Sequence, residues 1–239
     1  MIGGEHRGAG DESGSSGSHS AQSFYGRWAA LYDWIARGTP GIRAVRQQAA
    51  LACRLEPGDT VLEMGCGTGA NLPFLAEQVG PTGRVIGLDF TGPVLDRARR
   101  ATAHLEQVSV LRADATRPPI PDGAVDAVLG TFVVGMLSDP AGAVDEWIDL
   151  LAPDGHVVLV NAARSDAGTP LGPIVNAAFG AVVVLSTPPT MKLRYDRDLT
   201  DTLDRRIRTA HDRLRERSGA VADARHLGGI VRLTGGRLE

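Results

Sequence analysis

The sequence has 239 residues, enough for one domain with a sizeable hydrophobic core and for at most two domains. Its composition is that of an ordinary soluble globular protein, with 43% hydrophobic and 22% charged residues. The net charge of −3 gives no reason to expect a nucleic-acid partner held by bulk electrostatics.

Cysteine content and apolar runs bear on the compartment. The two cysteines, Cys53 and Cys66, fit a reducing compartment better than a disulfide framework. No positively charged, then apolar, signal sequence opens the chain. The longest apolar stretch, residues 171–185, contains Pro173, Asn176 and two glycines, so it is a poor membrane span. We therefore expect a cytoplasmic protein without a transmembrane segment.

The N-terminal part divides into a tail and two helices. Residues 1–22 are rich in Gly and Ser and have few large apolar groups, which predicts a disordered tail. The next residues predict a helix, because Phe24, Trp28, Leu31 and Ile35 recur at helical intervals. A second helix is predicted from Ile42 to Leu55.

A glycine-rich turn follows the first predicted strand. Residues 57–60 form a turn signal, and residues 61–64 predict a buried strand. The stretch "VLEMGCGTGANLPFL" then places Gly65, Gly67 and Gly69 within five positions, and Pro73 is tolerated in the first turn of the helix that follows. Glycine serves where the backbone takes a positive φ or where a ligand must touch the main chain. The usual ligand of such a strand–turn–helix corner is a nucleotide-like molecule.

Strands and helices alternate through the rest of the central region. Strands are predicted at residues 84–90, 108–113, 125–132 and 156–161. A helix opens at Thr91 and Pro93, and its apolar positions are Val94, Leu95, Ala98 and Leu105. Asp139 caps another helix, whose apolar stripe consists of Val144, Trp147, Ile148 and Leu151. Residues 153–155 are then expected to turn the chain into the fifth strand.

The C-terminal part predicts two helices and a strand pair. One helix is strongly apolar on one face, formed by Ile174, Val175, Ala178, Phe179, Val182 and Val183. A highly charged helix carries the apolar stripe Leu203, Ile207, Ala210 and Leu214. Two short strands are expected around Gly228 and Gly229. The predicted fold class is therefore α/β, with a doubly wound, mostly parallel sheet of about seven strands and helices on both faces.

The glycines alone leave the ligand open. Gly65, Gly67 and Ala70 satisfy the pattern of a nicotinamide dinucleotide site, and Asp89 lies twenty residues after Gly69, where an acid can bind ribose hydroxyls. An NAD(P)-dependent oxidoreductase is thus one reading of the motif. Glu63, two residues before Gly65, and the Asp114–Ala115 pair after the third strand are not part of that pattern.

With these acids, the sequence resembles the class I S-adenosylmethionine-dependent methyltransferases. The matching residues are Glu63, the G-x-G-x-G turn from Gly65 to Gly69, Asp89 and Asp114–Ala115, and the resemblance covers residues 24–161. It implies a Rossmann-like methyltransferase domain over residues 23–239. That domain would consist of N-terminal helices (23–56), a cofactor-binding core (57–161), and an apolar lid with a C-terminal helix and hairpin (162–239).

The resemblance also implies how S-adenosylmethionine binds. The backbone of the glycine turn would approach its methionine end, Asp89 would accept from the ribose hydroxyls, and Asp114 would accept from the adenine amino group. Glu63 would order the loop and the ligand's ammonium from below. The expected cofactor-binding residues are Tyr32, Glu63, Gly65, Cys66, Gly67, Thr68, Gly69, Asp89, Phe90, Asp114, Ala115 and Thr131.

The two ends of the domain resemble one group of this family. "SFYGRWAALYD" and "HLGGIVRLTGG" are similar to the opening and closing segments of the quinone-biosynthesis C-methyltransferases, although the latter lacks that group's Thr before the paired glycines. The similarity implies a lipophilic acceptor, such as a prenylated quinone precursor, with peripheral membrane contact as a further option. Phospholipid or other small-molecule N- or O-methyltransferases, and a catalytically silent cofactor-binding module, are the alternatives.

The acceptor side is expected to be formed by aromatic and polar residues near the strand ends and the apolar segment. Candidate substrate-binding residues are Tyr25, Phe132, Phe179, Arg194 and Tyr195, with Trp28 as a lining or core residue. The apolar face at residues 171–185 is a lid over an isoprenoid tail or, alternatively, a homodimer contact or a cover for the sheet.

The expected mechanism is in-line displacement at the methyl carbon, for which the protein supplies alignment and exclusion of water. We assign no general base; His211 and Asp33 are the candidates if the nucleophile must lose a proton. Cys66 is interpreted as an apolar filler. His104 and His156 lack the spacing of metal ligands, so no metal site is expected.

Overall fold

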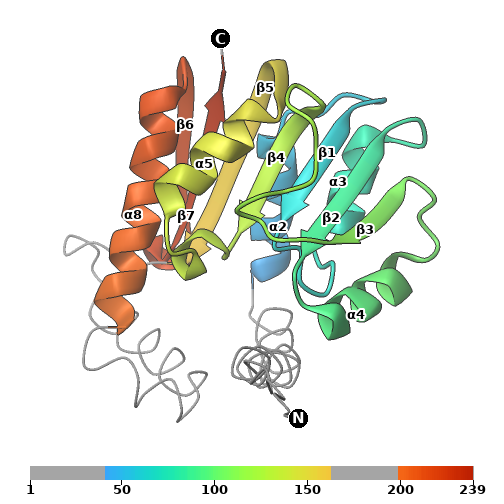
Figure 1. Cartoon of the computed structure of the whole chain (residues 1–239), viewed down its shortest axis with the longest axis horizontal. Coiled ribbons are helices and arrows are strands. Elements are labelled where there is room, and N and C mark those ends of the chain that lie inside the picture. The colour runs from blue at the N-terminus through green and yellow to red at the C-terminus, as the bar shows by residue number, and fades with distance from the viewer. Residues whose placement is uncertain (1–40, 163–198, 239) are drawn as a thin grey trace, which may run out of the picture.

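Seven strands form one sheet in the part of the chain that this computed structural model describes, residues 41–162 and 199–238 (Figure 1). The strand order is β3-β2-β1-β4-β5-β7-β6. Neighbouring strands are parallel except for β7, which runs antiparallel to both β5 and β6. The strands are β1 Thr60–Met64, β2 Arg84–Asp89, β3 Val108–Arg112, β4 Val125–Thr131, β5 Leu151–Ala162, β6 Ala220–His226 and β7 Val231–Arg237.

Helices pack on both faces of this sheet. One apolar cluster joins the sheet to α2, α3 and α4, and a second joins the other face to α5 and α8. In Figure 1, α5 and α8 lie in front of the sheet and α2 lies behind it. The helices are α2 Ile42–Ala52, α3 Leu72–Val79, α4 Gly92–Thr102, α5 Pro140–Asp149 and α8 Leu199–Arg217, with 3-10 helices η1 Val134–Met136 and η2 Leu227–Gly229. The predicted doubly wound, mostly parallel fold is confirmed.

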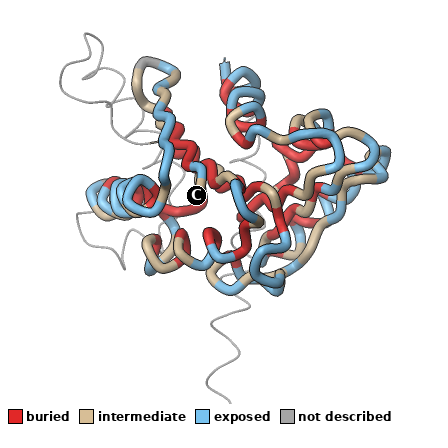
Figure 2. Tube along the Cα trace, turned by 90° about the horizontal axis from the view of Figure 1, so that it is seen from above, coloured by how far each residue is buried: buried red, intermediate tan, exposed pale blue. Residues whose placement is uncertain are grey.

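The buried strands explain why the sequence forms this sheet. Val61, Leu62 and Met64 of β1 are fully buried, as expected for a central parallel strand that is covered on both faces. β4 and the second half of β5 are buried in a similar way, and in Figure 2 the buried residues gather in the interior of the domain while exposed residues lie on its outer helices and loops. Glu63 is the exception, because it is a carboxylic acid with no exposed surface in the middle of this apolar strand.

Several predicted boundaries were wrong. The second helix ends at Ala52 and not at Leu55, and Leu105 lies beyond the end of α4. The predicted turn at residues 153–155 is an irregularity inside β5, which begins at Leu151 and shifts register against β4 before His156. The last two strands are seven residues each and are longer than predicted. The first predicted helix and the apolar segment 171–185 lie outside the described residues.

The connection from β3 to β4 carries no helix and instead covers the sheet as a loop. Residues 113–124 form turns, and Ala115 and Ile120 pack against the same apolar cluster as α5. Trp147 of α5, which is 0% exposed, donates its Nε1–H to the carbonyl oxygen of Ala115 at 2.7 Å. A buried indole N–H needs such a partner, and here the bond fixes the loop directly after Asp114.

Replacing this indole with a ring that cannot donate tests how much the bond contributes. We expect Trp147→Phe to lower the free energy of unfolding by about 1–3 kcal/mol, because the buried Ala115 carbonyl loses its partner and the ring leaves a small void. Urea denaturation measures the change. An unfolding midpoint equal to that of the wild type would show that the loop is held by other contacts.

Candidate functional site

The three glycines of the turn after β1 all adopt positive φ angles, but for different reasons. Their φ values are 66° at Gly65, 56° at Gly67 and 79° at Gly69. A β-carbon at Gly65 would lie 2.8 Å from Val133, and one at Gly69 would lie 3.1 Å from Ala98 and Leu72. At Gly67 a β-carbon would meet no atom of the described residues within 4 Å. The first and third glycines therefore permit close packing, whereas the second presents bare backbone to open space.

Glu63 lies beneath this turn with its two carboxylate oxygens in unequal surroundings. Oε1 accepts a hydrogen bond from Asn71 Nδ2 and a second, at 3.2 Å, from the hydroxyl of Thr131. Oε2 is buried and has no hydrogen-bond partner among the residues that the structure describes. A buried carboxylate oxygen without a partner is costly, so this position is suited to a donor from outside residues 41–162 and 199–238, such as a ligand.

Asn71 connects Glu63 to a buried arginine. Arg46 Nη1 on α2 donates to Asn71 Oδ1 at 2.7 Å, and Asn71 Nδ2 also donates to Thr131 Oγ1 at 2.8 Å. The contact with Arg46 fixes the amide orientation, because a guanidinium only donates, so Oδ1 must face Arg46 and Nδ2 must face Glu63 and Thr131. The chain of bonds therefore runs from Arg46 through Asn71 to Glu63 and Thr131.

Burial raises the pKa of Glu63 to about 7. The hydrogen bonds from Asn71 and Thr131 and the charge of Arg46 lower this pKa, but they only partly offset the desolvation, and the nearby Asp89 raises it. In the free protein Glu63 is thus poised between its neutral and ionised forms near neutral pH. A cation placed at Oε2 would favour the ionised form.

Asp89, at the carboxyl end of β2, is bonded to two backbone N–H groups. Its Oδ2 accepts from Gly67 N at 3.0 Å and its Oδ1 accepts from Thr91 N at 2.8 Å. These bonds join the glycine turn to the start of α4. Each carboxylate oxygen can accept more than one bond, so Asp89 keeps the capacity to accept from hydroxyl groups of a ligand.

Asp114 lies next to this acid, one strand further toward the sheet edge. The N–H of Ala113 donates to the Asp89 carbonyl at 3.1 Å, which brings the end of β3 beside the end of β2. Asp114 is exposed, and its Oδ1 accepts from both the N–H and the hydroxyl of Thr116 at 2.8 Å. Glu63, Asp89 and Asp114 thus follow one edge of the sheet, as predicted.

Thr131 and Phe132 end β4 on the other side of the turn. The Thr131 hydroxyl is committed to Glu63 and Asn71, so it belongs to the same network as the acid. Phe132 has a positive φ of 56°, which is uncommon for a residue with a β-carbon, and its N–H donates to the Val160 carbonyl at 2.7 Å. Such strain is typical of functional sites, and here it lies directly after the strand that faces the glycine turn.

Three further predicted residues surround the turn. Cys66 is buried, and burial raises the pKa of its thiol well above the usual range, in agreement with its interpretation as an apolar filler. Thr68 is buried within the turn. Phe90 follows Asp89 and is 50% exposed, and its carbonyl accepts from Arg112 Nε at 3.1 Å.

Some predicted residues are not described, and two residues of the network were missed. Tyr25, Trp28, Tyr32, Asp33, Phe179, Arg194 and Tyr195 lie outside the described residues. Arg46 and Asn71 were not predicted from the sequence. The signal for Arg46 was a charged residue on the same helical face as Ile42, Val45 and Ala49, and the signal for Asn71 was an amide two residues after the last glycine.

His211 does not fit the role of a general base. Its ring is 2% exposed, Nδ1 lies 2.7 Å from Thr234 Oγ1, and Nε2 lies 3.2 Å from Asn161 Oδ1. Because Thr234 donates to Asp223 at 2.6 Å, its oxygen accepts the Nδ1 proton of His211. In the neutral ring Nε2 is then an acceptor, and it pairs with the Asn161 side chain when the amide NH₂ group of Asn161 faces the ring. Burial, followed by the charges of Arg215 and Arg232, lowers the pKa of His211 to about 4. The imidazole is a neutral structural link between α8 and the sheet.

No group of three or more His, Cys, Asp or Glu side chains in residues 41–162 and 199–238 is placed to hold a metal ion.

Comparison with known proteins decides between the cofactor alternatives. Residues 62–159, which contain the turn and all three acids, match the methyltransferase domain family. The nocamycin O-methyltransferase of Saccharothrix syringae is 31% identical over 211 residues, which is 87% of this chain and 71% of that protein. The chain belongs to the S-adenosylmethionine-dependent methyltransferases. Its cofactor is S-adenosylmethionine, and the nicotinamide alternative is set aside.

Other methyltransferases match in different proportions. The phosphatidylethanolamine N-methyltransferase of Cereibacter sphaeroides is 35% identical, covering 64% of this chain and 72% of that protein. The 2-phytyl-1,4-naphtoquinone methyltransferase of Thermosynechococcus vestitus is 32% identical, covering 59% and 63%. The chain spans from 35% to 72% of the length of the first curated relatives it matches.

Solved structures agree on the fold. A methyltransferase of Thermotoga maritima, described as a possible histamine N-methyltransferase, superimposes with a TM-score of 0.59. The match covers 91% of this chain and 99% of that one at 16% identity. At this identity the similarity shows the fold alone, and the acceptor must be argued separately.

The residues of the methyltransferase site fit its cofactor. The orphan oxygen of Glu63 is suited to an ammonium group, the open backbone at Gly67 allows a ligand to approach, and Asp89 can accept from ribose hydroxyls. When bound, the cofactor supplies a methyl group on a sulfonium that is already a good leaving group. The chain's own residues then have to bind, orient and exclude water, which requires no dedicated acid–base pair.

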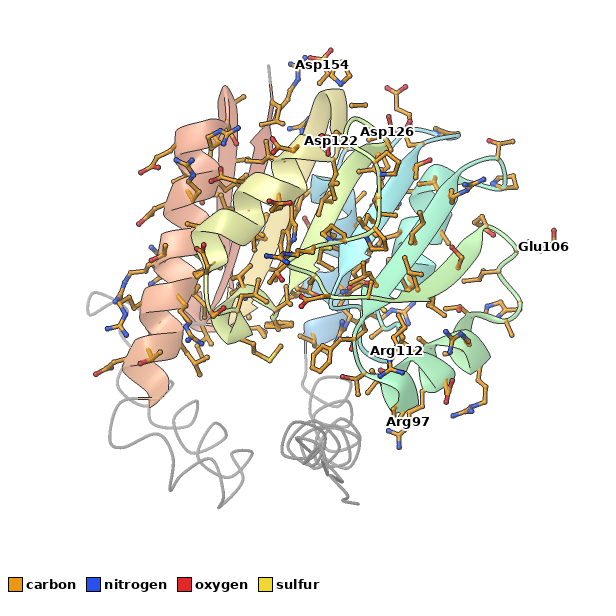
Figure 3. The ribbon with its side chains drawn as sticks, viewed as in Figure 1. Arg97, Glu106, Arg112, Asp122, Asp126 and Asp154 are labelled. Carbon is orange, nitrogen blue, oxygen red and sulfur yellow. The ribbon has the colours of Figure 1, made fainter. Side chains whose placement is uncertain are left out.

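The open space at Gly67 gives a sharp test with a matched control. Gly123, with φ 68°, also has no atom within 4 Å of an added β-carbon. It follows Asp122, which Figure 3 shows at the edge of the sheet opposite to Arg112. We expect Gly67→Ala and Gly123→Ala to lose similar stability, about 1 kcal/mol from left-handed strain, while only Gly67→Ala weakens S-adenosylhomocysteine binding, by at least about tenfold.

Calorimetric titration and urea unfolding provide the two measurements. Normal S-adenosylhomocysteine affinity in a folded Gly67→Ala protein would remove the turn from the cofactor site.

The raised pKa of Glu63 predicts that removing its charge stabilises the free protein at high pH but weakens cofactor binding. Because its pKa rises from 4.5 to about 7 on folding, the stabilising effect of its neutral form is complete below pH 4.5 and is lost as the pH rises through about 7. Glu63→Gln cannot ionise, so we expect it to be more stable than the wild type at pH 8, by on the order of 1–3 kcal/mol, with little gain at pH 5.

The same variant should bind S-adenosylhomocysteine more weakly, because the neutral amide cannot pair with an ammonium. Thermal melts at the two pH values, with and without ligand, check both effects. A variant that is less stable at pH 8 and binds normally would contradict the assignment.

Proposed function

We propose that the chain transfers a methyl group from S-adenosylmethionine to a lipophilic small molecule, with a prenylated quinone precursor as the first candidate acceptor. The observation that carries this proposal is the distribution of exposed apolar side chains. Phe90, Met136 and Leu227 are 50%, 60% and 36% exposed, and they follow β2, β4 and β6 respectively. Because β6 runs parallel to β5, all three lie at the carboxyl edge of the sheet, where the cofactor binds.

Relatives with lipophilic acceptors support the same class of substrate. Among the matching proteins are one named for a phytyl naphthoquinone and one named for phosphatidylethanolamine. The second name makes a phospholipid headgroup the second candidate acceptor. The apolar segment 171–185, which follows β5, remains the predicted lid over an isoprenoid tail and lies outside the described residues.

Neither Thr131 nor His211, two titratable or hydroxyl side chains among the described residues, is suited to take a proton from the acceptor. The Thr131 hydroxyl is bound to Glu63 and Asn71, and His211 is buried with a pKa lowered to about 4. An acceptor that reaches the site already nucleophilic, such as an electron-rich quinol ring, fits this arrangement. None of the helices described in residues 41–162 and 199–238 is long and apolar enough to cross a membrane.

Acceptors that differ only in their tails test the proposal. The full chain is incubated with methyl-labelled cofactor and demethylated naphthoquinols that carry no, one or several isoprene units, and in parallel with phosphatidylethanolamine vesicles. We expect labelled quinol product and a Michaelis constant that falls at least about tenfold from the tail-less to the long-tailed acceptor, since each buried CH₂ contributes about 0.8 kcal/mol. Label in phosphatidylethanolamine alone would select the second candidate.

A charge at the carboxyl edge provides the matched comparison. Met136→Asp should raise the Michaelis constant for the long-tailed acceptor, whereas Val221→Asp, at an exposed apolar position near the start of β6, should leave it unchanged. Equal activity on tailed and tail-less acceptors would refute the lipophilic acceptor. No labelled product with any acceptor would favour a silent cofactor-binding module.

A further inference from the structure

Arg46 is a charged side chain in an apolar setting. It lies on the face of α2 that packs against the sheet, among Ile42, Val45 and Ala49, and only 9% of it is exposed. Burial of a guanidinium is costly and is retained where the charge or its hydrogen bonds have a use. One of those bonds is the 2.7 Å contact from Nη1 to Asn71 Oδ1.

Asn71 is equally unusual for its place in the fold. It is the N-cap residue of α3, a position where an asparagine side chain normally accepts from a backbone N–H of the first turn. Here the side chain makes no such bond. It accepts from Arg46 and donates to Glu63 and Thr131 instead. The helix thus gives up a cap, which indicates that the amide is used to arrange Glu63.

We propose that Arg46 and Asn71 are positioning residues for the cofactor, holding the Glu63 carboxylate so that Oε1 is satisfied inside the protein and Oε2 is left for the cofactor's ammonium group. Asn71 and Thr131 both bond to Oε1, whereas Oε2 has no partner within residues 41–162 and 199–238. The inference rests on the cofactor of the family and is independent of the proposed acceptor.

Arg46 affects the pKa of Glu63 through its charge as well as through the position of Asn71. The charged groups that act on Glu63 are Arg46 from α2, which lowers its pKa, and Asp89 from β2, which raises it. Cys66 is buried and its thiol has a raised pKa, so it is neutral. Removing the charge of Arg46 therefore raises the pKa of Glu63 further, and the ionised form that binds an ammonium appears only at higher pH.

A purely structural role would look different. If Arg46 only tied α2 to α3, its loss would lower stability and weaken all ligands of the site together, with the same dependence on pH. A positioning role predicts a pH-dependent loss that is confined to ligands with an ammonium group. 5′-Methylthioadenosine, which lacks the amino and carboxylate groups, separates these two cases.

The test compares dissociation constants of S-adenosylhomocysteine and 5′-methylthioadenosine between pH 5.5 and 9 for the full chain. In the wild type, we expect S-adenosylhomocysteine affinity to fall about tenfold per pH unit below a midpoint near 7, where Glu63 titrates. Arg46→Gln should move this midpoint upward by at least about half a pH unit, and Arg46→Lys should restore it. Affinity for 5′-methylthioadenosine should change little.

Two further variants keep the test decisive if Arg46→Gln folds poorly. Asn71→Asp is isosteric and can still pair with Arg46, but it places a second carboxylate beside Glu63, so it should also raise the midpoint. Arg43→Gln removes an exposed arginine from the same helix, and it should leave the midpoint unchanged. The guanidinium carbon of Arg43 lies 5.5 Å from the centroid of the Phe74 ring. Unchanged midpoints in both Arg46→Gln and Asn71→Asp, or parallel losses for both ligands, would overturn the inference.

Discussion

A half-satisfied carboxylate in the central strand is the constraint around which this site is built. Glu63 has no exposed surface, and within the described part of the chain only Oε1 of its two oxygens has partners. The free protein carries the cost of that arrangement as a pKa raised to about 7. A ligand that brings an ammonium group relieves the cost, so part of the binding free energy is stored in the folded protein before the cofactor arrives.

The topology of the sheet brings the partners of Glu63 together. The chain moves outward from β1 to β2 and β3, then returns to β4 on the other side of β1. The reversal lies at β1, and the carboxyl end of the strand at such a point is the usual ligand position in doubly wound sheets. Asn71 enters from the start of α3, Thr131 from the end of β4 and Arg46 from α2. Asp89 ties the turn to β2 through the Gly67 N–H.

The parts of the site that sequence predicts are those encoded locally. Glycines at fixed spacing and acids at the ends of apolar runs identify Glu63, Gly67 and Asp89 without any knowledge of distant contacts. The roles of Arg46 and Asn71 become visible only when α2, α3 and β4 pack together. Arg46 is 25 residues from its partner Asn71 along the chain, and Asn71 is 60 residues from its partner Thr131. The exposed residue Asp114 was found by pattern, yet the indole that fixes its loop comes from α5.

The boundaries of strands and helices also divide into those that local sequence predicts and those that depend on distant contacts. Apolar patterns located β1, β2, β4 and β5, whose buried residues leave a strong signal, whereas the mostly exposed β6 was located only in its last part. The patterns missed the start of β5 at Leu151, because the Pro-Asp-Gly turn signal is accommodated there as an irregularity inside the strand. His211 showed how a titratable residue is misread from sequence: its neighbours Asn161 and Thr234 come from β5 and β7, and they make it a structural group.

Proton release on cofactor binding tests the role of Glu63 most directly. Titration of the full chain with S-adenosylhomocysteine at pH 6.5, in buffers of different ionisation enthalpy, gives the number of protons exchanged. A carboxyl group with a pKa of about 7 that becomes ionised on binding should release more than roughly half a proton at this pH and almost none at pH 8.5. The Glu63→Gln protein should release none. Equal proton exchange in the wild type and in Glu63→Gln would contradict the pairing of Glu63 with the cofactor's ammonium group.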